Sequence, residues 1–563
     1  GGRLVTPNTT NAEEKKLINV VEEMAIASGV PVPLIYVLDN ESGINAFAAG
    51  KTQADAAIGV TRGCIEQLSR DELQGVIAHE FSHILHGDMR LNIRLMGVVH
   101  GILIIGIMGY WFMRSAAYAG RSRNRNSGGA ALGMLAAGGI LAAIGYIGVF
   151  FGNLIKAGVS RQREFLADAS AVQFTRNPSG LVNALKRLGG YAQGSRIENR
   201  HNLEMSHMFF GDGVKRRILF SGLLATHPPL EKRIAAIDAT FDPKAARATG
   251  QAVGVAAGVG GASNFAGGPA ASASPSSASA LTNVAGDHEF DASPAQLTAD
   301  VGTPKPEHVS FSAALIRSFP GELVDAAHDP IGSQALIMAL LLDSDPSLIE
   351  KQLADVTTQL GEAVASACSK LAPTVGLLGP RARLPLTDLS VPALRMMDAA
   401  GYGRFAQGME LLIQADNKVT LFEYCLRKII TTQIGSRFST SRTNAPKAHD
   451  VSAVLPEISV LLSLLAFVGH DDETEVRKAF AAAESQLGAK QPLQLVPKEH
   501  NRLSAFDVAL DRLNAAVPGV KRRILTAAAH CVAADGKVTV EEAEVLRAVA
   551  GSLECPLPPF LSE

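Results

Sequence analysis

The residues most able to do chemistry are His79-Glu80-Phe81-Ser82-His83, which carry two imidazoles and a carboxylate at the spacing that a hydrolytic zinc ion requires. Residues four apart lie on one face of a helix, so His79 and His83 can bind the same metal ion while Glu80 faces a metal-bound water. This pattern predicts the active site of a metallopeptidase. The alternative is two ordinary buried histidines, but burying them beside a glutamate without partners would be costly.

The flanking sequence predicts a helix around this motif. Ser69 can cap the free amides of the first turn, and Asp71 and Glu72 suit the positive end of the helix dipole. Apolar residues follow at helical spacing and Gly87 is a natural stop. We expect His86 at the surface, because a third helical ligand would crowd the open coordination position.

A hydrolytic zinc ion also needs a third protein ligand. Glu164 and Asp168 are four apart and share a helical face. Glu164 would coordinate the metal, and Asp168 would accept the N–H of a ligating imidazole and fix its tautomer. The alternative is a solvated charged face, since both residues lie among arginines.

Two apolar stretches lie between the motif and Glu164. Residues 95–113 and 126–155 contain no charged side chain over 19 and 30 positions, and each is long enough to cross a bilayer. Three Gly-x-x-x-Gly pairs, at 97/101, 129/133 and 148/152, would let the two helices approach closely. We predict a membrane hairpin inserted in a catalytic domain. Two buried helices of a soluble core are the alternative, although such helices usually carry a polar face.

Four ordered features over about residues 12–240 together resemble the HtpX-type membrane zinc endopeptidases, relatives of the CAAX prenyl endopeptidases. They are the 79–83 motif, the hydrophobic hairpin, Arg-Glu-Phe-Leu-Ala-Asp at 163–168 and Thr-His-Pro-Pro-Leu-Glu-Lys-Arg at 226–233. The resemblance implies that His79, His83 and Glu164 bind zinc and that Glu80 is the general base.

The resemblance also implies that His227 helps to stabilise the oxyanion and that Arg233 supports the site. From the residues alone, His227 before two prolines would be only a turn residue. Short apolar runs at 34–38, 44–48 and 54–60 predict a small sheet ahead of the catalytic helix. In the resembling family the strand with Asn45, Ala46 and Phe47 is an edge to which a substrate peptide adds by backbone hydrogen bonds; an ordinary strand is the alternative.

The predicted cofactor is one Zn²⁺ per chain, although cobalt or manganese could substitute. Zinc would lower the pKa of its bound water, and Glu80 would take the proton before attack on a polypeptide substrate. The net charge of −2 gives no reason to expect a nucleic-acid partner. The chain begins Gly1-Gly2 and not Met, so a truncated or processed chain is expected, and the sequence leaves open whether membrane spans precede it.

The expected location is a bacterial inner membrane, as a multi-pass protein with its active site facing the cytoplasm. Basic residues near the spans number four in the loop and five on the catalytic side, so charge does not decide the orientation. Five scattered cysteines without Cys-x-x-Cys spacing are typical of reduced thiols, which favours a cytoplasmic site. The resemblance implies the same orientation.

The composition changes after residue 242. Residues 243–304 are rich in Ala, Gly, Ser and Pro and predict a flexible linker. Residues 305–563 show short apolar helical runs, including 458–468, too short to span a membrane. A weak repeat relates 415–423 to 534–542, with Thr420 and Thr539 as caps and Glu423 and Glu542 completing capping boxes; a calcium loop is the alternative for the second copy. This copy resembles the TerB-like helical domain, which implies an interaction or regulatory module with a protein partner.

The predicted fold class is α+β, with a zincin-like, mostly helical catalytic domain and a small sheet. Residues 1–94 and 156–242 would form this domain, residues 95–155 the membrane hairpin, residues 243–304 the linker and residues 305–563 an all-α domain. The predicted function is a membrane-bound zinc endopeptidase in quality control of membrane proteins. The alternative is a noncatalytic membrane scaffold that presents the C-terminal module, although a scaffold is not expected to keep every catalytic residue type in order.

Overall fold

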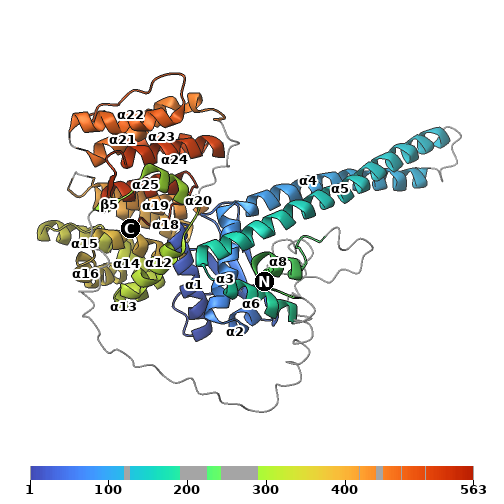
Figure 1. Cartoon of the computed structure of the whole chain (residues 1–563), viewed down its shortest axis with the longest axis horizontal. Coiled ribbons are helices and arrows are strands. Elements are labelled where there is room, and N and C mark those ends of the chain that lie inside the picture. The colour runs from blue at the N-terminus through green and yellow to red at the C-terminus, as the bar shows by residue number, and fades with distance from the viewer. Residues whose placement is uncertain are drawn as a thin grey trace, which may run out of the picture.

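Helices dominate the molecule, and a small mixed sheet lies near its N-terminus (Figure 1). The computed structural model describes residues 2–119, 127–190, 225–242, 289–416, 419–438, 448–470, 472–500 and 503–561. The predicted α+β class, with an all-α C-terminal part, is confirmed.

The N-terminal part contains β1 (Arg3–Leu4), α1 (Ala12–Ser28), β2 (Leu34–Leu38), β3 (Ala46–Ala49), β4 (Ala57–Thr61), α2 (Arg62–Gln67), α3 (Arg70–Leu85), α4 (Asp88–Ala119), α5 (Ser127–Thr175), α6 (Pro178–Gly190) and α8 (Leu230–Ile237). The first half of the C-terminal part contains β5 (Glu289–Asp291), α11 (Pro294–Asp300), α12 (Pro306–Ser318), α13 (Gly321–His328), α14 (Pro330–Leu340), α15 (Pro346–Leu360), α16 (Glu362–Gly376), α17 (Pro380–Leu394) and α18 (Ala399–Ile413). The second half contains α19 (Leu421–Ile430), a π-helical turn (Thr431–Gly435), α20 (Ser436–Phe438), a 3₁₀ turn (Val451–Val454), α21 (Leu455–Gly469), α22 (Glu473–Leu487), α23 (Leu503–Asn514), α24 (Pro518–Val532), β6 (Lys537–Thr539) and α25 (Val540–Ser552).

The N-terminal sheet has the strand order β1-β2-β4-β3, so β3 lies at an edge. β2 and β4 are parallel, and β3 runs antiparallel to β4 with Phe47 opposite Gly59. A Cβ atom on residue 59 would lie 2.3 Å from the Phe47 ring, so only glycine leaves room for that ring. All three predicted strands are present, and the edge strand is the one expected beside the catalytic helix.

The catalytic helix α3 begins and ends as predicted. Ser69 and Glu72 form a reciprocal capping box, with the Ser69 N–H donating to Glu72 at 2.8 Å and the Glu72 N–H to Ser69 at 3.3 Å. Gly87 adopts a left-handed conformation with φ of 69° directly after the helix. This turn lets the chain reverse at once into α4, which brings Asp88 back toward the histidines.

The helices α4 and α5 form a long hairpin that projects from the rest of the molecule (Figure 1). Both are long and apolar enough to cross a membrane, and their large apolar side chains are mostly exposed. The helices continue without a break into the catalytic part, because α4 starts at Asp88 and α5 runs on to Thr175. The membrane hairpin and the candidate site therefore share two continuous helices.

The predicted glycine contacts in this hairpin are only partly correct. A Cβ atom on Gly97, Gly101, Gly129 or Gly133 would meet nothing within 4 Å, so two of the three predicted pairs do not lie at the helix interface. The close approach occurs instead at Gly106 with Gly145 and at Gly109 with Gly138. Gly-x-x-x-Gly spacing places two glycines on one face, but it does not say which face meets the partner helix.

The third apolar helix, in the C-terminal part, is a core helix. The segment Val451–Gly469 is long and apolar enough to span a membrane, yet 61% of its most apolar window is buried inside the molecule. Ile458, Leu461 and Leu465 are fully buried among the neighbouring helices. The expectation that this run is too short to span a membrane is wrong, because the helical segment extends beyond 458–468, but its burial agrees with the expected packed core.

The repeat and the linker have different outcomes. Both predicted capping boxes are confirmed, Thr420 with Glu423 and Thr539 with Glu542. The predicted linker, however, ends earlier than residue 304, because β5 pairs with β6 and α11 buries Leu297 in the C-terminal core. Residues 243–288 lie outside the described part of the chain. The TerB-like character of this region stays a prediction.

The C-terminal helices pack directly on the N-terminal part. The second half of helix α1, residues 20–28, is buried on all sides, and its Ile26 belongs to the core formed by α13, α14 and α16. His328 lies 2.7 Å from the buried Glu22, and α12 lies against α1 (Figure 1). Helix α1 therefore has two partners, the sheet with α3 on one side and the C-terminal helices on the other.

Candidate metal centre

Three predicted ligands from two helices meet at one point. His79 and His83 come from α3 and Glu164 comes from α5, and one donor atom of each lies within 4.8 Å of the others. The Nε2 atoms of the two histidines are 3.2 Å apart, and Glu164 Oε1 lies 3.5 Å from His83 Nε2. The other oxygen, Oε2, lies 3.7 Å from His79 Nε2. His79 and Glu164 are fully buried, and His83 is 16% exposed, so the group opens on the side of His83.

Carboxylates hold the opposite nitrogen of each imidazole. His79 Nδ1 lies 3.0 Å from Asp168, as predicted, and His83 Nδ1 lies 2.9 Å from Asp88. A carboxylate accepts the Nδ1 hydrogen, which turns both Nε2 atoms toward Glu164 as metal ligands. Two nitrogens bound tetrahedrally to zinc would be about 3.3 Å apart, close to the observed separation. The donor set therefore fits a divalent metal ion such as zinc.

The electrostatics of this group favour a cation between the three side chains. Burial by itself would lower the pKa of His83, but the carboxylates of Asp88 and Glu164 outweigh it and raise the pKa to about 10. Burial lowers the pKa of His79 and keeps this imidazole neutral, which is the ligand form. At neutral pH the carboxylates thus favour a positive charge on or beside His83 Nε2. That charge is a proton on the nitrogen or a metal ion that replaces the proton.

Glu80 is buried beside the same group and faces the edge strand. Its side chain is 1% exposed, neither carboxylate oxygen has a hydrogen-bond partner among the described residues, and the nearby backbone of Ala48 in β3 favours the charged form. Burial raises the pKa of Glu80 to about 7, with the charge of Glu164 acting in the same direction. A carboxyl group of this pKa can both accept and return a proton near neutral pH.

The segment 225–242 places His227 and Arg233 beside the cluster of His79, His83 and Glu164. His227 Nδ1 lies 3.0 Å from Glu164 Oε2. Arg233 begins the second turn of α8, is completely buried, and donates to both oxygens of Asp168 at 2.8 and 2.6 Å. It also lies 3.4 Å from Glu164. Arg233 therefore neutralises the two carboxylates that surround His79.

The structure brings together every predicted catalytic, ligand and supporting residue, and the predicted substrate residues Asn45, Ala46 and Phe47 lie in or next to β3. His86 is exposed, as predicted, and its Nδ1 lies near Ser82 instead of the metal ligands.

Sequence reasoning missed Asp88. It is 3% exposed and lies between His83 and Arg163, 3.2 Å from the latter. An acidic residue directly after the helix-ending Gly87 and five positions after His83 was the available signal.

Asp88→Asn is expected to weaken metal binding by about 10- to 100-fold, because an asparagine cannot hold the His83 N–H as strongly as a carboxylate. Competition with a chelator of known affinity would measure the change. Asp71→Asn, in the exposed first turn of the same helix, removes the same charge and should leave the affinity unchanged. Equal affinities for wild type and Asp88→Asn would contradict the assigned role of Asp88.

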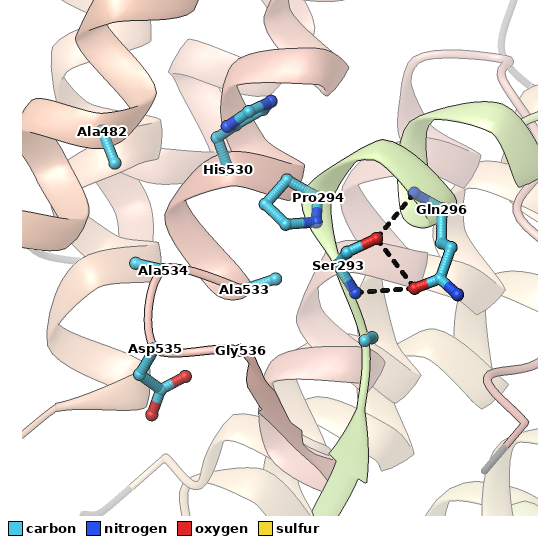
Figure 2. Close-up of a pocket in the computed structure, with 10 residues that line it drawn as sticks. Ser293, Pro294, Gln296, Ala482, His530, Ala533, Ala534, Asp535 and Gly536 are labelled. Carbon is cyan, nitrogen blue, oxygen red and sulfur yellow. Dashed lines mark hydrogen bonds between the residues drawn. The ribbon is translucent and has the colours of Figure 1, made fainter. Parts of the chain in front are cut away.

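A cavity far along the sequence from this group lies in the C-terminal part. It has a volume of about 590 Å³ and lies between residues 292–296 of the α11 start and the turn at 533–536. Figure 2 shows that its His530 and Asp535 side chains point in different directions. Among the described residues, the group at His79, His83 and Glu164 is the only cluster of three or more His, Cys, Asp or Glu side chains close enough to hold a metal.

Comparison with known proteins agrees with this site. Residues 11–241 match Peptidase family M48, a range that includes every residue of the candidate metal centre. A protease HtpX homolog of Bacteroides fragilis is 37% identical over 232 residues, which are 40% of this chain and 69% of the relative. One from Caldanaerobacter subterraneus subsp. tengcongensis is 40% identical over 220 residues, 39% of this chain and 69% of the relative. No solved structure gives a significant match.

The family match covers strands β2 to β4, the helix α3, the hairpin and the segment with Arg233, but not the C-terminal helices. The cluster of two histidines and a glutamate lies inside the matched range. The chain therefore belongs to peptidase family M48, among the HtpX-type metallopeptidases.

Proposed function

We propose that this chain is a membrane-bound, zinc-dependent endopeptidase. The observation that carries the proposal is the convergence of His79, His83 and Glu164 around one point with the buried Glu80 beside it. A zinc ion held there would lower the pKa of a bound water and polarise a peptide carbonyl. The chain's own residues would supply the proton transfers, the charge balance and the substrate position.

Glu80 is the proposed general base. Its carboxylate would accept a proton from the attacking water and return it to the leaving amine, for which a pKa near neutrality is suitable. His227, held beside Glu164, would stabilise negative charge on the substrate oxygen. Asp168, Asp88 and Arg233 would keep the ligands in place without touching the substrate.

The edge strand β3 is the proposed binding site for the substrate backbone. Thr61 N–H donates to Asn45 O at 3.0 Å, which makes Asn45 a paired residue toward β4. Hydrogen-bonding directions alternate along a strand, so the backbone groups of Ala46 and Ala48 point away from β4, where the Ala46 N–H already donates to the Asn45 side-chain oxygen at 3.0 Å. An extended peptide could add there, next to Glu80, with little demand on its side chains.

Substrates near the membrane are the proposed class, which supports a role in quality control of membrane proteins. Glu164 lies nine residues beyond the apolar stretch that ends at Ile155, or about 13 Å along a continuous helix. An extended chain covers that height in about four residues. A polypeptide anchored in the same bilayer would therefore reach the site with the segment close to its anchor.

The proposed location is the bacterial inner membrane with the site toward the cytoplasm. The five cysteines are all unpaired thiols, and they lie outside the hairpin, on the side of the metal centre. Free thiols suit a reducing compartment.

Metal removal tests the function. The full chain in lipid vesicles is expected to cleave a membrane-anchored protein with an unfolded segment next to its anchor. Chelation should abolish cleavage and zinc should restore it, because the proposed step needs the polarising metal. Mass spectrometry of the products would place the cut. An intact substrate despite one bound zinc per chain would overturn the proposal and favour a noncatalytic scaffold.

A further inference from the structure

A buried arginine of the C-terminal part reaches into the N-terminal part. Arg395 follows α17 and is only 4% exposed. Its guanidinium donates to the backbone oxygen of Val32 at 3.1 Å and to that of Ala54. Arg437 in α20, just after the π-helical turn Thr431–Gly435, donates to the backbone oxygen of Arg395 itself. One residue thus ties α17 to two backbone segments of the peptidase part.

This contact would be costly to open. Burial lowers the pKa of Arg395 to about 10, which still leaves the side chain charged at neutral pH. A buried charge needs hydrogen-bond partners, and these partners are the backbone oxygens of Val32 and Ala54. Separation of the C-terminal part from the N-terminal part would leave these two backbone oxygens without their buried donor.

Ala54 belongs to the loop between β3 and β4, and the same loop is held at a second point. Arg90 donates to the backbone oxygen of Lys51 at 3.1 Å and pairs with Glu554 at 3.0 Å. Asp55 closes the loop internally by accepting the N–H groups of Lys51 and Thr52. The C-terminal part therefore holds the loop at two points. Arg395 binds the loop directly at Ala54, and Glu554 acts indirectly by pairing with Arg90, which binds the loop at Lys51.

The tail of the chain adds a third contact on the same face. The backbone oxygen of Leu557 lies so close to Gly29 that a Cβ atom there would be 2.1 Å away. Gly29 ends α1 with φ of 69°, and Val32 follows three residues later, just before β2. The C-terminal part thus contacts the segment before β2 as well as the loop that ends β3.

We propose that the C-terminal helical part is a positioning element of the peptidase, which holds the β3–β4 hairpin in the arrangement that receives substrate, with Arg395 as the main contact. The proposal rests on the proposed function, because β3 is the strand assigned to bind the substrate backbone. Loss of the Arg395 contact loosens the loop, and β3, whose one strand partner in the described sheet is β4, becomes more mobile. Binding of substrate then includes the cost of ordering the strand.

Arg395→Met tests this in the full chain. The KM for an unfolded substrate should rise by about tenfold, while kcat changes less than about twofold, because the metal centre is untouched. Backbone amides of residues 46–56 should exchange hydrogen about tenfold faster, and zinc content should stay at one per chain. Arg395→Lys should raise KM and hydrogen exchange less than Arg395→Met does, since an ammonium can still reach one of the two oxygens.

Arg477→Met is the matched control, because Arg477 is exposed and pairs only within its own helix, with Glu473. It should change neither KM nor exchange. If Arg395→Met proves unstable, Glu554→Gln offers a milder test, with a smaller rise in exchange at residues 50–56. Unchanged exchange and KM in both variants would overturn the positioning role.

The exchange measurement separates this proposal from the function on which it rests. A wild-type chain that binds zinc but cleaves nothing would refute the peptidase, and exchange at residues 46–56 would still report on the contact. Faster exchange together with lower kcat at constant KM would overturn the inference, because it would place the effect on the chemical step and not on substrate binding.

Discussion

Glu80→Gln is expected to lower the rate of peptide cleavage by about 10²- to 10⁴-fold while metal content stays unchanged. Glutamine keeps the shape of the side chain and leaves His79, His83 and Glu164 in place, but it cannot accept a proton. Cleavage of an unfolded protein by the detergent-solubilised chain, with zinc measured in the same samples, would check this. Glu66→Gln, which alters an exposed carboxylate on α2, is the matched control.

The same variant should be more stable than the wild type after chelation. Glu80 has a pKa of about 7 in the folded chain and 4.5 as its ordinary value, so burial penalises its charged form. The penalty is absent below pH 4.5 and complete above pH 7, where removing the charge would stabilise the fold by about 3 kcal/mol. Thermal unfolding of Glu80→Gln and of the wild type at pH 8 and pH 4.5 would measure the difference in stability.

Cleavage by Glu80→Gln at the wild-type rate would reject the general-base role.

Arg233→Met is expected to destabilise the fold by about 3 to 5 kcal/mol. The guanidinium is completely buried and neutralises Asp168 and Glu164, so its removal leaves two carboxylates buried with less compensation. Activity should fall as well, because Asp168 would no longer hold His79 in a fixed position. Arg233→Lys should lose less, since it keeps the charge but not the paired hydrogen bonds.

Thermal unfolding in detergent at equal zinc content would measure this loss. Arg187→Met is the matched control, because Arg187 pairs with Glu72 at 2.8 Å but is 47% exposed. Solvent screens such a pair, so the control should cost less than about 1 kcal/mol. Equal losses in the two variants would show that burial of Arg233 contributes nothing special.

Local patterns predicted most of the site. The spacing of His79 and His83, and that of Glu164 and Asp168, place side chains on helix faces before any tertiary contact is known. The caps at Ser69, Thr420 and Thr539 are equally local, since each concerns the few residues of one helix end. The positions of His227 and Arg233 came from the family resemblance, because the residues alone indicated only a turn.

Contacts between distant elements were out of reach of such patterns. Asp88 reaches His83 because Gly87 turns the chain back, and the close glycines of the hairpin depend on how α4 is rotated against α5. The boundary of the linker was misplaced because β5 has a partner, β6, about 250 residues away in the sequence. Composition predicts flexibility where no partner is visible.

Residue spacing predicts the chemistry proposed for this protein, namely three candidate metal ligands, a candidate base beside them and two apolar helices that suit a membrane. Periodicity and spacing express these properties within single helices. Only the packed structure shows which carboxylate holds which imidazole and what the C-terminal helices contact. Arg395 shows the reason: its partners Val32 and Ala54 are more than 300 residues away, and only the packed fold brings a charged side chain to two backbone oxygens.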